Sequence, residues 1–166
     1  KEKDLIGIPW LFAFAMRKDG WYLRQDIIWH KPNPMPESVK DRCTKSHEYI
    51  FLFSKNRKYF YDNEAIKEPV KKDWGTRDRT KGKYHNTGTG LQPHSGLTKS
   101  YERKNKRSVW SVTVKPYKEA HFATYPPDLI EPCIKAGSEE GDTILDPFMG
   151  AGTTAAVAKS LNRYYI

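Results

Sequence analysis

The twelve residues from Thr143 to Thr154, TILDPFMGAGTT, constrain the fold of this chain more than any other stretch. The first three are apolar or β-branched and predict a short buried strand. Asp146-Pro147 ends this strand, because proline has no N–H to donate to a ladder. Gly150 and Gly152 then permit a tight turn and the close approach of another molecule to the backbone. The stretch therefore predicts a strand followed directly by a glycine loop.

The glycine loop leads into a helix N-terminus, since Thr153 and Thr154 are placed to cap a helix over residues 155–161. Free backbone N–H groups and a partial positive charge there favour an anionic ligand group. Asp146, at the strand end, can accept hydrogen bonds from a cationic or hydroxyl group of the same ligand. A ligand with a carboxylate, an ammonium group and a ribose suits both. A purely structural turn is the alternative, and neither the Walker nor the dinucleotide pattern is present.

The full string Asp-Pro-Phe-Met-Gly-Ala-Gly-Thr-Thr closely resembles the S-adenosylmethionine loop of DNA amino-methyltransferases, which make N6-methyladenine or N4-methylcytosine. The resemblance implies an α/β fold: a partial Rossmann-like, S-adenosylmethionine-dependent methyltransferase sheet with an inserted basic, loop-rich recognition region. It also implies that S-adenosylmethionine is the cofactor. The residues that match the family's loop are Asp146, Pro147, Phe148, Gly150, Gly152, Thr153 and Thr154.

Positive charge is concentrated in the middle of the chain. Residues 55–119 contain 17 Lys and Arg against 7 Asp and Glu, whereas the rest of the chain contains 12 against 13. The net charge of +9 therefore comes from this segment, which favours a polyanionic partner such as nucleic acid. A solvated surface insertion is the alternative reading of the same charge.

The length of 166 residues suits one domain, and no apolar run approaches the ~20 residues of a membrane span. The sequence shows no secretory signal. Cys43 and Cys133 form no metal motif, which favours two reduced thiols in a cytoplasmic protein, and no metal is expected. Together with the family resemblance, these features predict a bacterial or phage-encoded protein.

Three apolar segments precede the basic region. Residues 5–18 predict a helix, because Pro9 suits its first turn and Gly20 the position after its end. This helix is apolar nearly all round and should pack against a sheet. Residues 21–29 and 47–54 are aromatic and β-branched, so two strands are expected. The second is apolar on both faces, which predicts a central or covered strand.

The connection between these strands begins with three prolines at alternate positions, in HKPNPMPES from His30 to Ser38. Alternating prolines exclude a helix and favour a stiff, extended loop. A loop of this length is often functional, although a rigid surface turn is the alternative. Its polar side chains suit contact with a base and its phosphates. These residues are His30, Lys31, Asn33, Glu37, Ser38, Arg42 and Lys45.

Residues 20–38 and 44–55 also resemble the late catalytic-domain motifs of the same methyltransferase family. The resemblance implies that the proline-rich loop lines the pocket for a flipped target base, and that the two strands form an antiparallel hairpin at the sheet edge. It places the target-recognition region at residues 55–118, where cations can neutralise phosphates and aromatic rings can stack. Within it, residues 81–100 are predicted to be mobile without a partner. Residues 109–114 alternate and predict a strand.

The segment HFATYPPDLIEPCIKAG, residues 121–137, resembles the family segment that immediately precedes the cofactor loop. In the family, the residues that match His121, Phe122 and Thr124 help to hold the cofactor. An ordinary capped or buried histidine would explain His121 without that resemblance. A helix is predicted over residues 128–136.

The catalytic tetrad of the family, Asp/Asn/Ser-Pro-Pro-Tyr/Phe/Trp, is absent from the chain in forward order. Tyr125-Pro-Pro-Asp128 reverses it, and stands before a predicted helix instead of after a strand. In the family's order the tetrad lies upstream of Leu5, and the acid that binds the cofactor ribose lies beyond Ile166. We therefore expect an internal fragment of a larger methyltransferase, without a catalytic residue and inactive on its own.

The predicted organisation has three parts: a late catalytic part (1–54), a target-recognition region (55–118) and a cofactor-binding part (119–166). The predicted parent is a site-specific DNA methyltransferase of restriction–modification type that acts on N4 of cytosine or N6 of adenine. Double-stranded DNA is the expected partner, no membrane association is expected, and a homodimer is left open. The alternatives are a non-catalytic DNA-binding module with a vestigial methyltransferase fold, and a methyltransferase that acts on RNA or protein.

Overall fold

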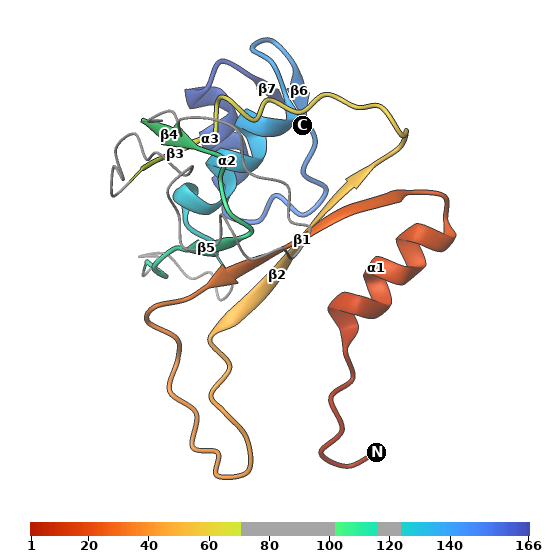
Figure 1. Ribbon diagram of the computed structural model, residues 1–166, viewed down its shortest axis with the longest axis vertical. Coiled ribbons are helices and arrows are strands. Elements are labelled where there is room, and N and C mark those ends of the chain that lie inside the picture. The colour runs from red at the N-terminus through yellow and green to blue at the C-terminus, as the bar shows by residue number, and fades with distance from the viewer. Residues whose placement is uncertain (71–101, 116–123) are drawn as a thin grey trace, which may run out of the picture. The chain divides into compact units, whose positions relative to one another are not determined.

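The computed structural model describes residues 1–70, 102–115 and 124–166, and these contain three helices and seven strands (Figure 1). The chain divides into two compact units, a larger one of residues 1–66 and 107–166 and a smaller one of residues 67–106. In the part of the chain that the structure describes, no helix is long and apolar enough to cross a membrane.

Helix α1 (Ile8–Lys18) packs against the neighbouring hairpin, as its apolar sequence predicts (Figure 1). The ring of Trp10 meets two rings of the hairpin edge-on, those of Tyr49 and Phe51, at centroid distances of 5.4 and 5.3 Å. The helix begins later than predicted, because Gly7 has a φ of 72° and cannot belong to a right-handed helix.

Strand β1 (Tyr22–His30) is the middle strand of a three-stranded sheet with the order β2-β1-β5. Strand β2 (His47–Ser54) runs antiparallel to β1, which confirms the predicted hairpin. Strand β5 (Val109–Ser111) runs parallel to β1 and is shorter than the predicted 109–114. The sheet thus brings a segment from late in the chain alongside the end of β1.

Strand β2 is covered, as predicted, but it is not central. Among the strands that the structure describes, it lies at the edge of its sheet. Its residues alternate between the two faces, so both faces can be apolar only because both are covered. Rings from α1 pack on one face, and Ile50 on the other packs against a buried cluster. This cluster consists of Ile27, Trp29, Trp110 and Leu129.

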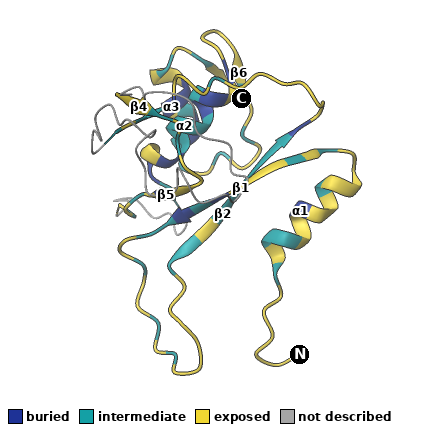
Figure 2. Cartoon of the chain, viewed as in Figure 1, coloured by how far each residue is buried: buried dark blue, intermediate teal, exposed yellow. Residues whose placement is uncertain are grey.

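The rest of the larger unit contains two helices and a two-stranded parallel sheet. Its elements are α2 (Pro127–Gly137), β6 (Thr143–Ile144), α3 (Thr153–Ser160) and β7 (Tyr164–Tyr165). Strands β6 and β7 run parallel and are joined through α3, which is a strand–helix–strand unit. Ile134, Val157 and Ala158 form a second buried cluster between α2 and α3, dark blue in Figure 2.

The smaller unit contains an antiparallel pair, β3 (Glu68–Pro69) and β4 (Arg103–Lys104). The guanidinium of Arg103 donates a hydrogen bond of 3.0 Å to the carbonyl of Lys67. The segment that the sequence predicts to be mobile, residues 81–100, lies outside the described residues.

Candidate functional site

The loop after β6 is held by the carboxylate of Asp146. One oxygen, Oδ1, accepts a hydrogen bond of 3.0 Å from the backbone N–H of Phe148, two residues on. The other, Oδ2, accepts hydrogen bonds from the hydroxyls of Thr154, at 2.6 Å, and Tyr125, at 3.2 Å. The backbone N–H of Asp146 donates to the carbonyl of Ile166 at 3.0 Å. Asp146 therefore lies at the point where the hydrogen bonding between β6 and β7 ends and the loop begins.

Two glycines give the loop its path into α3. Gly150 and Gly152 have φ values of 53° and 77°, in the left-handed region that side chains other than glycine rarely adopt. Gly152 occupies the position that precedes the helix, and no side chain caps it. The prediction that Thr153 and Thr154 cap this helix is therefore wrong. They lie inside its first turn, and the Thr154 hydroxyl donates to Asp146 instead.

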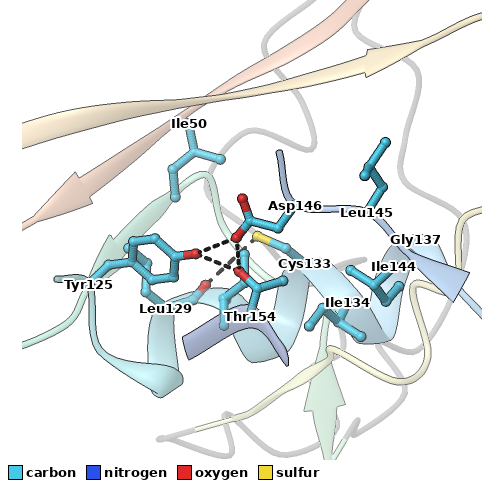
Figure 3. Close-up of a pocket in the computed structure, with 11 residues that line it drawn as sticks. Ile50, Tyr125, Leu129, Cys133, Ile134, Gly137, Ile144, Leu145, Asp146 and Thr154 are labelled. Atoms are coloured by element: carbon cyan, nitrogen blue, oxygen red, sulfur yellow. Dashed lines mark hydrogen bonds between the residues drawn. The ribbon is translucent and has the colours of Figure 1, made fainter. Parts of the chain in front are cut away.

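Tyr125 completes a three-residue polar network that joins segments far apart in the sequence (Figure 3). Its hydroxyl lies 2.5 Å from the hydroxyl of Thr154 as well as 3.2 Å from Asp146, 21 positions along the chain. Thr154 is 4% exposed, so the network has a buried centre. No role for Tyr125 was predicted from the sequence. The one feature of the sequence that could have indicated a role is that Tyr125 directly follows Thr124, a predicted cofactor residue.

The network shifts the protonation of two of its members in opposite directions. The hydrogen bond from Thr154 lowers the pKa of Asp146, helped by the N–H of Phe148 and the hydroxyl of Tyr125, while burial opposes the shift. Burial raises the pKa of Tyr125, and the charge of Asp146 adds to this. At neutral pH the carboxylate is therefore charged and the phenol is protonated.

A mostly apolar pocket of about 440 Å³ borders the network (Figure 3). Aliphatic side chains of α2 and β6 form most of its wall, and the oxygens of the network lie along one side. Its lining consists of Ile50, Tyr125, Leu129, Ile130, Cys133, Ile134, Gly137, Ile144, Leu145, Asp146 and Thr154.

The structure brings five of the predicted cofactor residues together around this loop. They are Asp146, Gly150, Gly152, Thr153 and Thr154. Pro147 and Phe148 lie in the same loop, and the Phe148 side chain is 89% exposed. Thr124 is half-buried next to the network. His121 and Phe122 lie outside the described residues.

The proline-rich loop is closed at its neck by a backbone hydrogen bond of 2.8 Å from Lys31 to the carbonyl of Ser46. At this neck the Lys31 ammonium pairs with the carboxylate of Glu48 and lies 4.5 Å from the ring centroid of Trp29. The imidazole Nδ1 of His30 lies 3.1 Å from the hydroxyl of Ser111. His30 and Lys31 therefore both have partners in the sheet.

The remaining predicted base-contacting residues differ in their partners. Arg42 and Glu37 pair with each other at 2.5 Å. Both polar ends of the Asn33 amide bond the backbone of Val114, at 3.0 and 2.9 Å. Ser38 and Lys45 are exposed.

In the described ranges, no three His, Cys, Asp or Glu side chains are grouped in a way that could hold a metal ion. Neither Cys43 nor Cys133 is part of a disulfide.

A parallel strand–helix–strand unit, with an acid at the strand end and a glycine loop before the helix, defines a protein of the Rossmann-like class. Within that class, the chain belongs to the DNA methylase family of the N6/N4 type, whose family model matches residues 2–166. The family predicted from the loop and hairpin motifs is thereby confirmed.

The chain is 49% identical over 166 residues to the Type II methyltransferase M.XycI of Xanthomonas campestris pv. cyanopsidis. This alignment covers all of the chain and 46% of that protein, so the chain spans about half the length of the curated relatives it matches.

Two solved structures share the fold and confirm the predicted Rossmann-like methyltransferase architecture. The complex of M1.HpyAVI with SAM has a TM-score of 0.63 at 21% identity, covering 98% of this chain and 63% of that one. The PvuII DNA methyltransferase, described as cytosine-N4-specific, has a TM-score of 0.65 at 18% identity, covering 98% and 54%.

Proposed function

We propose that this chain is the cofactor-loop half of a DNA methyltransferase that moves a methyl group from S-adenosylmethionine to an exocyclic amino group of a DNA base. The observation that carries the proposal is the loop between β6 and α3. It places an ionised carboxylate at a strand end and a helix N-terminus directly after two glycines in left-handed conformations.

The donor set of this loop fits S-adenosylmethionine. An ionised Asp146 can accept hydrogen bonds from an ammonium or a ribose hydroxyl. The first turn of α3 cannot satisfy its own N–H groups, which therefore suit the carboxylate of the methionine portion. Gly150 and Gly152 carry no side chain that would keep the ligand from the backbone. Thr153 and Thr154 lie in that first turn, and M1.HpyAVI, a structural neighbour, forms a complex with SAM.

The chemistry divides between this chain and the rest of the enzyme. When bound, S-adenosylmethionine supplies an electrophilic methyl group. The acceptor is a weak nucleophile, because the lone pair of the amino nitrogen is delocalised into the ring. Residues of this chain bind and orient the reactants, which supplies much of the rate enhancement in such a reaction. We propose that the tetrad that activates the amino group lies in the part of the parent enzyme outside this sequence, and we expect no turnover from this chain alone.

DNA is the proposed polymer because of the charge and because of the proline-rich loop. The target-recognition region at residues 55–118 carries the positive excess of the chain and would neutralise phosphates. Lys45 and Ser38 of the loop are exposed, and so are available to contact a base and its phosphates. The relatives are Type II methyltransferases, so a role in restriction–modification is part of the proposal.

Incubating the full-length parent with S-adenosylmethionine and DNA, then separating the nucleosides by mass spectrometry, tests the proposal. N4-methylcytosine or N6-methyladenine is expected, and which one forms decides the acceptor. Parallel reactions with RNA and with protein provide the control. Methylation of only those polymers, or no binding of S-adenosylmethionine and DNA by the parent, would refute the proposed function.

A further inference from the structure

Pro32 lies two residues after the end of β1 and interrupts the pairing of β1 with β5. As far as His30 the pairing is made by the backbone, since the N–H of Val112 donates to the His30 carbonyl at 3.1 Å. In a parallel ladder of this register, the next bonds would use the N–H and the carbonyl of residue 32. Residue 32 is proline and has no N–H. The ladder therefore cannot continue in the usual way.

Side chains of β1 and of the loop make the hydrogen bonds beyond this point. The carbonyl of Val112 accepts a hydrogen bond of 2.8 Å from the indole Nε1 of Trp29. Beyond it, Asn33 Nδ2 donates to the carbonyl of Val114 at 3.0 Å, and Asn33 Oδ1 accepts from the N–H of Val114 at 2.9 Å. A carboxamide carries the same donor and acceptor as a peptide group, so Asn33 acts as a substitute for backbone pairing.

This pair of bonds connects two segments 81 positions apart. One is the start of the proline-rich loop, where Pro32 and Pro34 flank Asn33 and stiffen the chain. The other follows β5 directly. With one N–H and one carbonyl lone pair directed at Val114, the amide is not presented edge-on to a ligand, as bidentate base recognition requires.

We propose that Asn33 is a positioning residue that fixes the proline-rich loop on the segment after β5, and that it does not read the target base. The loop's exposed side chains, such as Lys45, are then the ones that meet DNA. The part of this inference that concerns DNA rests on the proposed function. The two hydrogen bonds between the Asn33 amide and the Val114 backbone, called the latch below, are independent of it.

Amide hydrogen exchange in the free 166-residue chain tests the latch without any ligand. In Asn33→Ala, the Val114 N–H loses its acceptor and should exchange at least about tenfold faster, as expected for a lost hydrogen bond. Asn33→Asp keeps an acceptor oxygen and should give a smaller change. Asn63→Ala, at an exposed asparagine after the hairpin, is the matched control and should leave Val114 unchanged. Unchanged Val114 exchange in Asn33→Ala would overturn the latch.

A second measurement needs no variant, and so covers the case in which Asn33→Ala fails to fold. In the wild-type chain, the Val114 N–H should show a scalar coupling across its hydrogen bond to the side-chain carbonyl carbon of Asn33. Absence of this coupling while neighbouring ladder couplings are seen would contradict the proposal.

Binding to two synthetic duplexes separates positioning from base reading. The proposal predicts that Asn33→Ala weakens binding to poly(dG·dC) and poly(dA·dT) by the same factor, because the loop as a whole is displaced. A change in the ratio of the two affinities would show that Asn33 reads a base. If the wild-type chain and its parent bind neither duplex, the proposed function fails, while the exchange result still decides the latch.

Discussion

The glycine loop after β6 and the proline-rich loop after β1 are both held in a defined conformation, but by different parts of the chain. Each begins where a strand ends, and each must hold a defined path without a regular ladder. In the glycine loop the backbone supplies the path, through left-handed φ values at Gly150 and Gly152. In the proline-rich loop Pro32 and Pro34 have no backbone N–H, and the side chains of Trp29 and Asn33 make hydrogen bonds to the segment after β5 instead.

The difference shows which polar groups are free to meet a ligand. In the glycine loop, the helix N-terminus is open because no side chain caps it, and the one charged group, Asp146, is held by two hydroxyls. In the proline-rich loop, Asn33 is engaged by the scaffold and Lys31 by Glu48, whereas Lys45 is exposed. In the proline-rich loop, the partners of a polar residue therefore separate those bound to the scaffold from those free to meet a ligand. Asp146 differs, because it is held by its hydroxyl partners and also lines the pocket.

The largest expected effect is on the acid of the glycine loop. Asp146→Asn keeps the shape of the side chain but removes the charge that an ammonium or ribose hydroxyl would meet. A hydrogen bond to a charged group contributes about 1.5–3 kcal/mol, so the dissociation constant for S-adenosylmethionine should rise by roughly 10- to 100-fold. Titration of the parent enzyme by calorimetry measures this. Glu140→Gln, an equal charge change at an exposed site, is the control. Equal affinities of the two variants for S-adenosylmethionine would mean that Asp146 does not contact the cofactor.

Gly152 tests whether the backbone of this loop depends on a left-handed residue. Gly152→Ala adds a methyl group with nothing within 4 Å, so its cost is conformational strain alone, about 1–2 kcal/mol of unfolding free energy. Urea unfolding of the chain measures it. Gly137→Ala is the matched control, because its added methyl group also meets nothing and its φ is not left-handed. Equal stability of the two variants would be inconsistent with strain at Gly152.

Tyr125 tests the hydroxyl network with a smaller change. Tyr125→Phe removes one hydroxyl and leaves the ring, and should lower the unfolding free energy by about 0.5–1.5 kcal/mol, the range for one hydrogen bond. Tyr22→Phe, on a side chain that is 46% exposed, should cost less. A Tyr125 variant as stable as this control would mean that the hydroxyl contributes nothing to holding Asp146.

The smallest effect is expected at the exposed cation of the proline-rich loop. Lys45→Ala should lower the slope of log affinity for DNA against log salt by about 0.9, the value for one phosphate contact. Fluorescence anisotropy over a range of salt concentrations measures the slope. Lys159→Ala, at the end of α3, is the control and should leave it unchanged. If Lys45→Ala also leaves the slope unchanged, the loop does not contact the phosphates.

Local patterns predicted most of the elements and both loops. Strand β2 matches its predicted bounds of 47–54, since a continuous aromatic run between polar residues is a strong local signal. Local patterns failed where a distant partner decides. Thr153 and Thr154 look like caps, but Asp146 takes the hydroxyl of Thr154. The strand predicted over 109–114 is shorter because the proline at residue 32, far away in the sequence, interrupts its partner.

The same limit applies to the residues of the site. The motif located Asp146 and both glycines, because their roles follow from the loop itself. Tyr125 was missed, since its hydroxyl acquires a role only when α2 and β6 pack together. Asn33 was assigned to the base, because nothing near it in the sequence reveals Val114 as its partner.

The central claim is that the loop between β6 and α3 binds S-adenosylmethionine, and backbone NMR of the chain tests it most directly. Adding S-adenosylmethionine should shift the amide signals of Gly150, Gly152 and Thr153 in a saturable way, even if affinity is weak. Asp146→Asn should need a higher ligand concentration for the same shifts. Shifts absent from these amides, or saturating at the same concentration in wild type and Asp146→Asn, would contradict the claim.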